Sequence, residues 1–253
     1  MKTKLLLIGF FTLLFILGLT LIQINSAGKT LAENSAPTNE TRPPMDIGKR
    51  DEARKTTGVI SGTINSDFLK KYSASQFIGK YPAVVYLDKV EGTFTPSTEP
   101  FKMDQLKLVF LPRVLPILKG STVRFLNNDK EDHNVFSPDV EKFNMGTWGY
   151  GGSKDRVFDR TGAYSILCDI HPEMIANIVV LDNPYFALLD KKNENGSAGF
   201  CITNVPPGKY NLKVWVEKNS DLKSVFKLFK DKTFEITVGS GQETAIDINP
   251  EKK

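Results

Sequence analysis

GAYSILCDIHPEM, residues 162–174, joins a strand pattern to a short loop that is rich in metal-ligand residues. Tyr164, Ile166 and Cys168 alternate with Ser165 and Leu167, and this period of two is typical of a half-buried strand. After Cys168, the loop carries a histidine and a methionine at further intervals of three. The pattern predicts a strand that ends at Cys168 and a tight loop that presents several ligands from one side.

The chain contains only two histidines. One is His171 in this loop, and the other is His133, which lies upstream and is expected on a different strand. One thiolate, two imidazoles and one thioether are the ligands of a blue-copper electron-transfer site, with Met as the long, weak axial ligand. We therefore predict that His133, Cys168, His171 and Met174 bind one copper ion per chain. Zinc is the weaker alternative, because structural zinc sites use four Cys or His ligands and rarely Met.

Short stretches with alternating apolar residues, bounded by Gly, Pro and Asn, recur along the chain and predict strands. Pro206-Pro207-Gly208 predicts a turn in which glycine takes a positive φ. Past the N-terminal segment, only residues 222–230 could form a short helix. The predicted class is all-β, built from sandwiches. The predicted strands lie at 58–64, 82–87, 106–110, 122–125, 164–168, 178–181 and 210–217.

The sequence of the N-terminal segment predicts that the protein is exported from the cytoplasm. Lys2 and Lys4 precede an apolar run that is longer than the core of a cleavable signal peptide and close to the ~20 residues that span a bilayer. Residues 1–27 are therefore a signal peptide or an anchor helix, and cleavage and membrane tethering both remain open. Residues 28–57 are polar and contain several prolines, which predicts a flexible linker. We expect the folded part in the periplasm or on the extracytoplasmic face of the membrane.

The charges are nearly balanced. Lys and Arg number 33 against 29 Asp and Glu, and the formal net charge is +4. No basic run is interleaved with aromatic residues, so we expect no nucleic-acid partner. The chain has two cysteines. A disulfide between them would remove Cys168 as a ligand, so Cys201 is treated as a structural residue.

Three segments carry a resemblance to a known family: LKGSTVRFLNND (118–129), HNV (133–135) and the stretch at 162–174. From Phe101 to about Asp182 the chain resembles the cupredoxins, in particular amicyanin, pseudoazurin and plastocyanin, and the Cys–His–Met spacing is that of amicyanin. The resemblance implies a Greek-key sandwich. It also implies three equatorial ligands and an axial ligand, which fall here on His133, Cys168 and His171, and on Met174.

Two further residues are expected to tune the site. By the resemblance, Asn134 ties the two ligand-bearing loops together, and outer partners of this kind orient metal ligands. Ile170 stands where the family often has Pro, so we predict that its N–H donates to the Cys168 sulfur and raises the reduction potential. Electrons are expected to pass through the apolar surface of the ligand loop near His171, with Ile175 close by.

A second resemblance lies nearer the C-terminus. GFCITNVPPGKYNLKV, residues 199–214, is similar to carboxypeptidase regulatory-like, transthyretin-type sandwiches. Modules of that type begin with strands like the two predicted before residue 90. We therefore predict that residues 58–90 plus 184–250 form a second small β-sandwich, with the cupredoxin domain, residues 91–183, inserted. A single extended cupredoxin over residues 58–183 is the alternative.

The predicted function is that of an exported mononuclear type 1 (blue) copper protein. It would carry single electrons between extracytoplasmic redox partners, such as a c-type cytochrome or a dehydrogenase. We expect no enzymatic activity, because two histidines cannot supply a further catalytic copper centre, and none is left for a Ser-His-Asp triad. Two alternatives stay open. One is a copper-handling carrier or sensor, against which the five Met of the chain argue, and the other is a β-sandwich binding module with a vestigial copper site.

Overall fold

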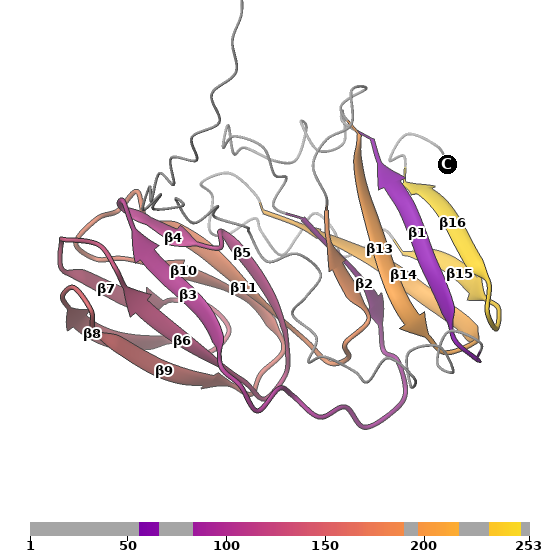
Figure 1. Ribbon diagram of the computed structural model, residues 1–253, viewed down its shortest axis with the longest axis horizontal. Coiled ribbons are helices and arrows are strands. Elements are labelled where there is room, and N and C mark those ends of the chain that lie inside the picture. Colours follow the sequence, from indigo (N-terminus) through magenta and orange to yellow (C-terminus); the bar gives the residue numbers. More distant parts are fainter. Residues whose placement is uncertain (1–55, 66–82, 190–196, 218–232, 249–253) are drawn as a thin grey trace, which may run out of the picture. The chain divides into compact units, whose positions relative to one another are not determined.

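The computed structural model describes residues 56–65, 83–189, 197–217 and 233–248 (Figure 1). Its elements in these residues are sixteen β-strands, which confirms the predicted all-β class. The predicted signal peptide or anchor, the linker and the short helix at 222–230 lie outside the described residues. Within the described residues, no helix is long and apolar enough to cross a membrane.

Nine strands from the middle of the chain form what we call the central sandwich. They are β3 (Phe101–Leu106), β4 (Val109–Leu111), β5 (Val114–Leu118), β6 (Ser121–Asn127), β7 (His133–Ser137), β8 (Phe143–Trp148), β9 (Ser153–Phe158), β10 (Gly162–Leu167) and β11 (Ile175–Leu181). One sheet has the order β4-β3-β6-β9, and the other has the order β5-β11-β10-β7-β8 (Figure 1). The sheets mix parallel and antiparallel neighbours, since β5 runs parallel to β11 and β3 runs parallel to β6.

The other strands flank this region in the sequence and form the flanking sandwich. They are β1 (Gly58–Ile64), β2 (Ala83–Asp88), β12 (Phe186–Leu188), β13 (Ala198–Val205), β14 (Gly208–Val216), β15 (Phe234–Val238) and β16 (Glu243–Ile248). Their sheets have the orders β13-β1-β16 and β12-β2-β14-β15. Strands that precede the central sandwich therefore pair with strands that follow it. The domain boundaries and the carboxypeptidase regulatory-like resemblance stay predictions.

A buried apolar cluster holds the two sheets of the central sandwich together. Tyr164 and Ile166 on β10 are fully buried in the same cluster as Cys168, as the alternation of this strand predicts. Val123 and Phe125 on β6 enter the cluster from the opposite sheet. Burying a large apolar side chain contributes about 1.5–3 kcal/mol, so this cluster fixes the face of β10 that points inward. It thereby fixes the direction in which Cys168 leaves the strand.

The turn at residues 206–208 joins β13 to β14, as predicted, but its glycine serves another purpose. The positive φ falls on Asn204, at 56°, and Gly208 has no positive φ. A β-carbon on Gly208 would lie 3.1 Å from the hydroxyl oxygen of Tyr210. That hydroxyl donates a hydrogen bond to the carbonyl of Pro206 at 2.9 Å. A side chain at this position would therefore push the tyrosine ring aside by a few tenths of an ångström, which glycine avoids.

The segment 106–110 is a hairpin and not the single strand predicted there. Leu106 ends β3 and Val109 begins β4, and the two residues pair with each other. Between them, Lys107 and Leu108 have φ values of 56° and 58°. Two successive positive values make the tight turn of a two-residue hairpin loop. The turn lacks the usual Asn-Gly or Asp-Gly pair. The alternation of apolar residues continues across it, so the sequence pattern does not indicate a turn.

We expect Leu108→Gly to raise the free energy of unfolding by about 1 kcal/mol, because glycine adopts a positive φ without the strain that a β-carbon causes. Leu108 is 37% exposed, so removal of its side chain loses less packing than removal of a fully buried leucine would. Urea unfolding followed by tryptophan fluorescence measures the change. The matched control is Val157→Gly on β9, where the residue is 47% exposed and has no positive φ. The control should lose stability, and a similar loss in Leu108→Gly would contradict the analysis.

Candidate metal centre

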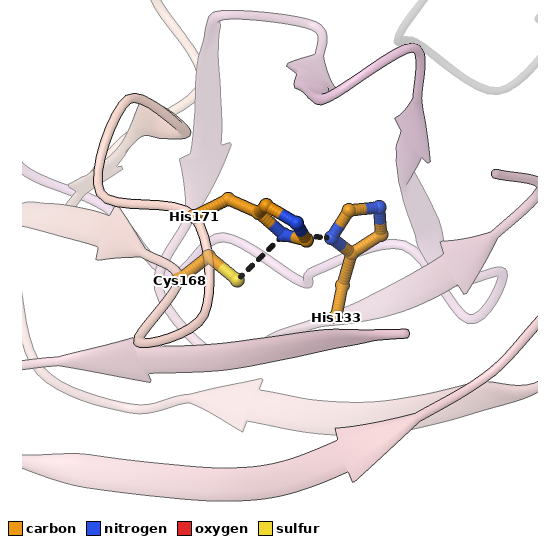
Figure 2. A group of neighbouring side chains, drawn as sticks. All are labelled: His133, Cys168 and His171. Carbon is orange, nitrogen blue, oxygen red and sulfur yellow. Dashed lines mark hydrogen bonds between the residues drawn. The ribbon is translucent and has the colours of Figure 1, made fainter. Parts of the chain in front are cut away.

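Strand pairing brings the two halves of the site together. His133 is the first residue of β7, and Cys168 directly follows the last residue of β10. These strands are antiparallel neighbours that pair at Phe136 and Leu167. The beginning of one antiparallel strand lies beside the end of its neighbour. His133 therefore stands next to the loop that leaves β10, and His171 comes back toward it from that loop (Figure 2).

The three side chains converge on one point (Figure 2). Nδ1 of His133 lies 3.0 Å from Nδ1 of His171, and Sγ of Cys168 lies 4.0 Å from the same His171 nitrogen. One ligand atom from each residue lies within 4.8 Å of the other two. Among the residues that the structure describes, this is the only group of three or more His, Cys, Asp or Glu side chains placed to share an ion.

Three of the four predicted ligands are shielded from solvent. His133 is 0% exposed, Cys168 is 3% exposed and Met174 is 1% exposed, whereas His171 is half-buried. Met174 shares the buried apolar cluster with Cys168. Its N–H donates to the carbonyl of His171 at 2.9 Å, which draws the loop into a tight turn. The structure thus gathers His133, Cys168 and His171 at one point and places Met174 in the cluster that surrounds Cys168.

Asn134 connects β7 to the ligand loop. Its backbone N–H donates to Sγ of Cys168 at 3.4 Å, and its side-chain Oδ1 accepts from the N–H of Asp169 at 3.3 Å. Its Nδ2 donates to Oδ1 of Asn144 on β8 at 2.8 Å. The pairing of β7 with β8 is irregular between Asn134 and Phe136. Bulges of this kind re-aim side chains next to functional sites, and here His133 and Asn134 are both buried.

The hydrogen bond to the sulfur of Cys168 does not come from the predicted donor. Among the described residues, no hydrogen bond joins the N–H of Ile170 to Sγ of Cys168, and the N–H donor is that of Asn134. The physical reason is the position of Ile170 on the outer side of the loop, where it is 46% exposed. The sulfur of Cys168 therefore accepts this hydrogen bond from β7 and not from its own loop.

The sequence analysis missed two residues that contact the site, Asp129 and Asn144. Oδ2 of Asp129 lies 3.2 Å from Nε2 of His133 and accepts the backbone N–H of Leu108 at 2.7 Å. The four-residue spacing between Asp129 and His133 is the one signal in the sequence for the first contact. Asn144 lies on an edge strand in an unremarkable sequence, and no pattern marks it.

The carboxylate of Asp129 is ionised at neutral pH. The backbone N–H of Leu108 holds the pKa of this carboxyl below its usual value, and the side chain of His133 and the N–H of Lys130 act in the same direction against partial burial. An ionised carboxylate facing Nε2 favours the imidazole tautomer with the proton on that atom. The lone pair of Nδ1 is then directed toward Cys168 and His171.

The residues present fit a copper ion. Bonds from a first-row metal to imidazole nitrogen and thiolate sulfur are about 2.0 and 2.3 Å, so two such ligand atoms can be up to about 4.3 Å apart. The separations of 3.0 Å and 4.0 Å that involve His171 fall within this limit. All three ligand atoms lie within 4.8 Å of one another, so the third pair needs at most a small closure to share an ion. Two imidazoles and a thiolate with a nearby thioether are the donor set that copper takes in electron-transfer sites.

No family model and no curated protein matches this chain. Solved structures resemble parts of it. A Cu-containing nitrite reductase (NirK) from Thermus scotoductus SA-01 is 28% identical with a TM-score of 0.33, over 38% of this chain and 25% of that chain. The match therefore spans a quarter of the nitrite reductase.

A purple cupredoxin from Nitrosopumilus maritimus is 26% identical with a TM-score of 0.31, over 32% of this chain and 99% of that chain. A reduced variant of amicyanin is 21% identical with a TM-score of 0.32, over 34% of this chain and 85% of that chain. Likenesses with TM-scores in this range assign no function.

Asn134→Ala is expected to lower the metal affinity about 10- to 100-fold, because residues that orient a ligand loop have effects of this size. It should also lower the free energy of unfolding by about 1–3 kcal/mol, since the buried Asn134 side chain loses its hydrogen bonds to Asp169 and Asn144. Copper competition with a chelator and urea unfolding measure the two effects. Asn211→Ala on β14, where the residue is exposed, is the control and should leave affinity unchanged. An unchanged affinity in Asn134→Ala would refute the bridging role.

Proposed function

We propose that this chain is an exported mononuclear type 1 copper protein that carries single electrons between extracytoplasmic redox partners. The observation that carries the proposal is the meeting of three ligand atoms at a buried point: Nδ1 of His133, Nδ1 of His171 and Sγ of Cys168. The two-sheet central sandwich, with ligands from β7 and from the loop after β10, supports a cupredoxin-like domain.

Copper suits the site better than zinc does. Met174 is buried beside Cys168 at 1% exposure, and thioether sulfur is a soft ligand that favours Cu(I) and is rare at structural zinc. When bound, a copper ion would supply a one-electron couple between Cu(II) and Cu(I). His133, Cys168, His171 and Met174 would hold the ion.

The protein around these ligands resists rearrangement. Asn134 joins β7 to the ligand loop through three hydrogen bonds, and the N–H of Met174 closes that loop on the carbonyl of His171. Ligands that keep one arrangement in both oxidation states lower the reorganisation that accompanies electron exchange. This rigidity supports electron transfer more than catalysis at an open coordination site.

The burial of the site also favours an electron carrier over a protein that hands copper to a partner. His133, Cys168 and Met174 are each at most 3% exposed, so a transfer partner could not reach them to take the metal. Both histidines of the chain lie in this one cluster, which leaves no imidazole for a second copper centre. We therefore propose that the chain is not itself an enzyme.

We propose that electrons leave the site through His171, the half-buried residue among the four proposed ligands. The loop around it presents Ile170, which is 46% exposed, and the exposed Pro172. We propose that an extracytoplasmic redox protein, such as a c-type cytochrome or a dehydrogenase, docks on this apolar surface. The apolar segment within residues 1–27 supports export, with the folded part in the periplasm or tethered to the membrane.

Copper-loaded protein is expected to show an intense blue thiolate-to-Cu(II) absorption band and the narrow hyperfine splitting of type 1 copper in its paramagnetic-resonance spectrum. Cys168→Ser should abolish the band, because the sulfur that gives rise to it is gone. Cys201→Ser in the flanking sandwich is the control and should retain it. A Cys168→Ser protein that keeps the blue band would rule out the proposed function.

Ile170→Asp is expected to slow electron self-exchange at least tenfold, because it places like charges where two copies must approach each other around His171. Line broadening in NMR spectra of mixed Cu(I) and Cu(II) protein measures the rate. Val157→Asp is the control, since Val157 is 47% exposed and pairs with Thr122 at the beginning of β6, at the end of the sheet away from the site. Equal rates in the two variants would locate the exit route elsewhere.

A further inference from the structure

Both oxygens of the Asp129 carboxylate have hydrogen-bonding partners. Oδ2 accepts the N–H of Leu108 at 2.7 Å and faces Nε2 of His133 at 3.2 Å, while Oδ1 accepts the N–H of Lys130 at 2.9 Å. The backbone N–H of Asp129 donates to Oδ1 of Asn127 at 2.9 Å. The side chain of Asp129 is only 13% exposed. Such a carboxylate has little freedom to move away from the histidine.

The loop that carries Asp129 has its own buried frame. Asn127 is 0% exposed, and its Nδ2 donates to the carbonyls of Glu131 and Trp148 at 3.0 and 2.9 Å. Asn128 is bound to Asp104 on β3 through Nδ2 at 2.8 Å. The position of Asp129 is thus set by the loop itself before any metal binds.

The two partners of Oδ2 belong to different sheets. Leu108 lies in the β3–β4 turn of the four-stranded sheet, and His133 begins β7 in the five-stranded sheet. Leu108 presents its N–H from a backbone with a φ of 58°, a conformation that is strained for a residue with a β-carbon. Strain of this kind persists where surrounding contacts hold it, and the bond to Asp129 is such a contact.

We propose that Asp129 is a positioning residue for the metal centre. Its carboxylate, anchored by the β3–β4 turn, holds the Nε2–H edge of His133 so that Nδ1 points at Cys168 and His171. Only the effect of Asp129 on the reduction potential rests on the proposed function. The orientation of His133 matters for any metal that these residues bind.

The charge of Asp129 gives it a second effect. A negative group next to a ligand stabilises the more positive Cu(II) form relative to Cu(I). The carboxylate therefore lowers the reduction potential. The N–H of Asn134 at the sulfur of Cys168 acts in the opposite direction, because it stabilises the electron-rich form.

Three variants of the full chain separate the two effects. Asp129→Asn keeps an oxygen in place and removes the charge, whereas Asp129→Ala removes both. Asp132→Asn removes the same charge three residues away in the sequence. The Asp132 side chain is exposed and lies near Gly149. Asp132 therefore serves as the matched charge control.

We expect Asp129→Ala to lower the affinity for copper and for zinc by about 10- to 100-fold. Asp129→Asn should shift the Cu(I)/Cu(II) equilibrium about tenfold toward Cu(I), which is about 59 mV for one electron. Asp132→Asn should shift neither quantity more than twofold. Equal shifts in Asp129→Asn and Asp132→Asn would overturn the proposal, as would an Asp129→Ala protein with unchanged affinities.

A readout without copper distinguishes failure of this inference from failure of the proposed function. In nitrogen NMR spectra of the zinc-bound protein, His133 should carry its proton on Nε2, with a slowly exchanging proton that is lost in Asp129→Ala. This result together with the zinc affinities would sustain the positioning role even if copper-loaded protein had no blue band. An unchanged His133 signal in Asp129→Ala would overturn the role whatever the colour of the protein. Urea unfolding of each variant shows that the fold is retained, and the isosteric Asp129→Asn covers the case in which Asp129→Ala does not fold.

Discussion

The antiparallel neighbourhood of β7 and β10 is the constraint on which the proposed site depends. It places the beginning of one strand beside the end of the other, and so brings His133 to the loop that carries Cys168 and His171. The inward direction of Cys168 follows from the burial of Tyr164 and Ile166 on the same face of β10. A slip of one residue in this pairing would turn the ligands to opposite faces of the sheet. The apolar core, to which Cys168 and Met174 themselves belong, therefore specifies the geometry of the proposed site.

Two hydrogen-bonding groups reach the ligands from outside, and they act on different atoms. The N–H of Asn134 approaches the sulfur of Cys168, and the carboxylate of Asp129 faces the far edge of His133. The first comes from an irregular point in β7, and the second from a loop tied to the β3–β4 turn. Separate segments of backbone thus contact the sulfur and the imidazole. The four ligand types alone do not set the properties of such a site.

The fold class and the convergence of His133, Cys168 and His171 were predictable because they rest on local patterns. The alternation through residues 164–168, the intervals of three after Cys168 and the presence of just two histidines are all visible in the sequence. The turn at Lys107 and Leu108 was not visible, because neither residue is typical of a position with positive φ. The contact of Asp129 with His133 was hidden as well, since it depends on how closely the two sheets approach. The donor to the sulfur was misassigned for the same reason: Ile170 is near in sequence, but Asn134 is near in space.

The parallel pairing of β1 with β16 has a consequence for the order in which the chain can fold. Ser61 on β1 and Glu243 on β16 are hydrogen-bonded although they are 182 residues apart in the sequence. The pairings of the central sandwich, by contrast, lie within residues 101–181. Long-range contacts form slowly, because closing a large loop loses chain entropy before any contact compensates for it. The central sandwich can therefore assemble as soon as its own strands have been synthesised, whereas the flanking sandwich must wait for β16.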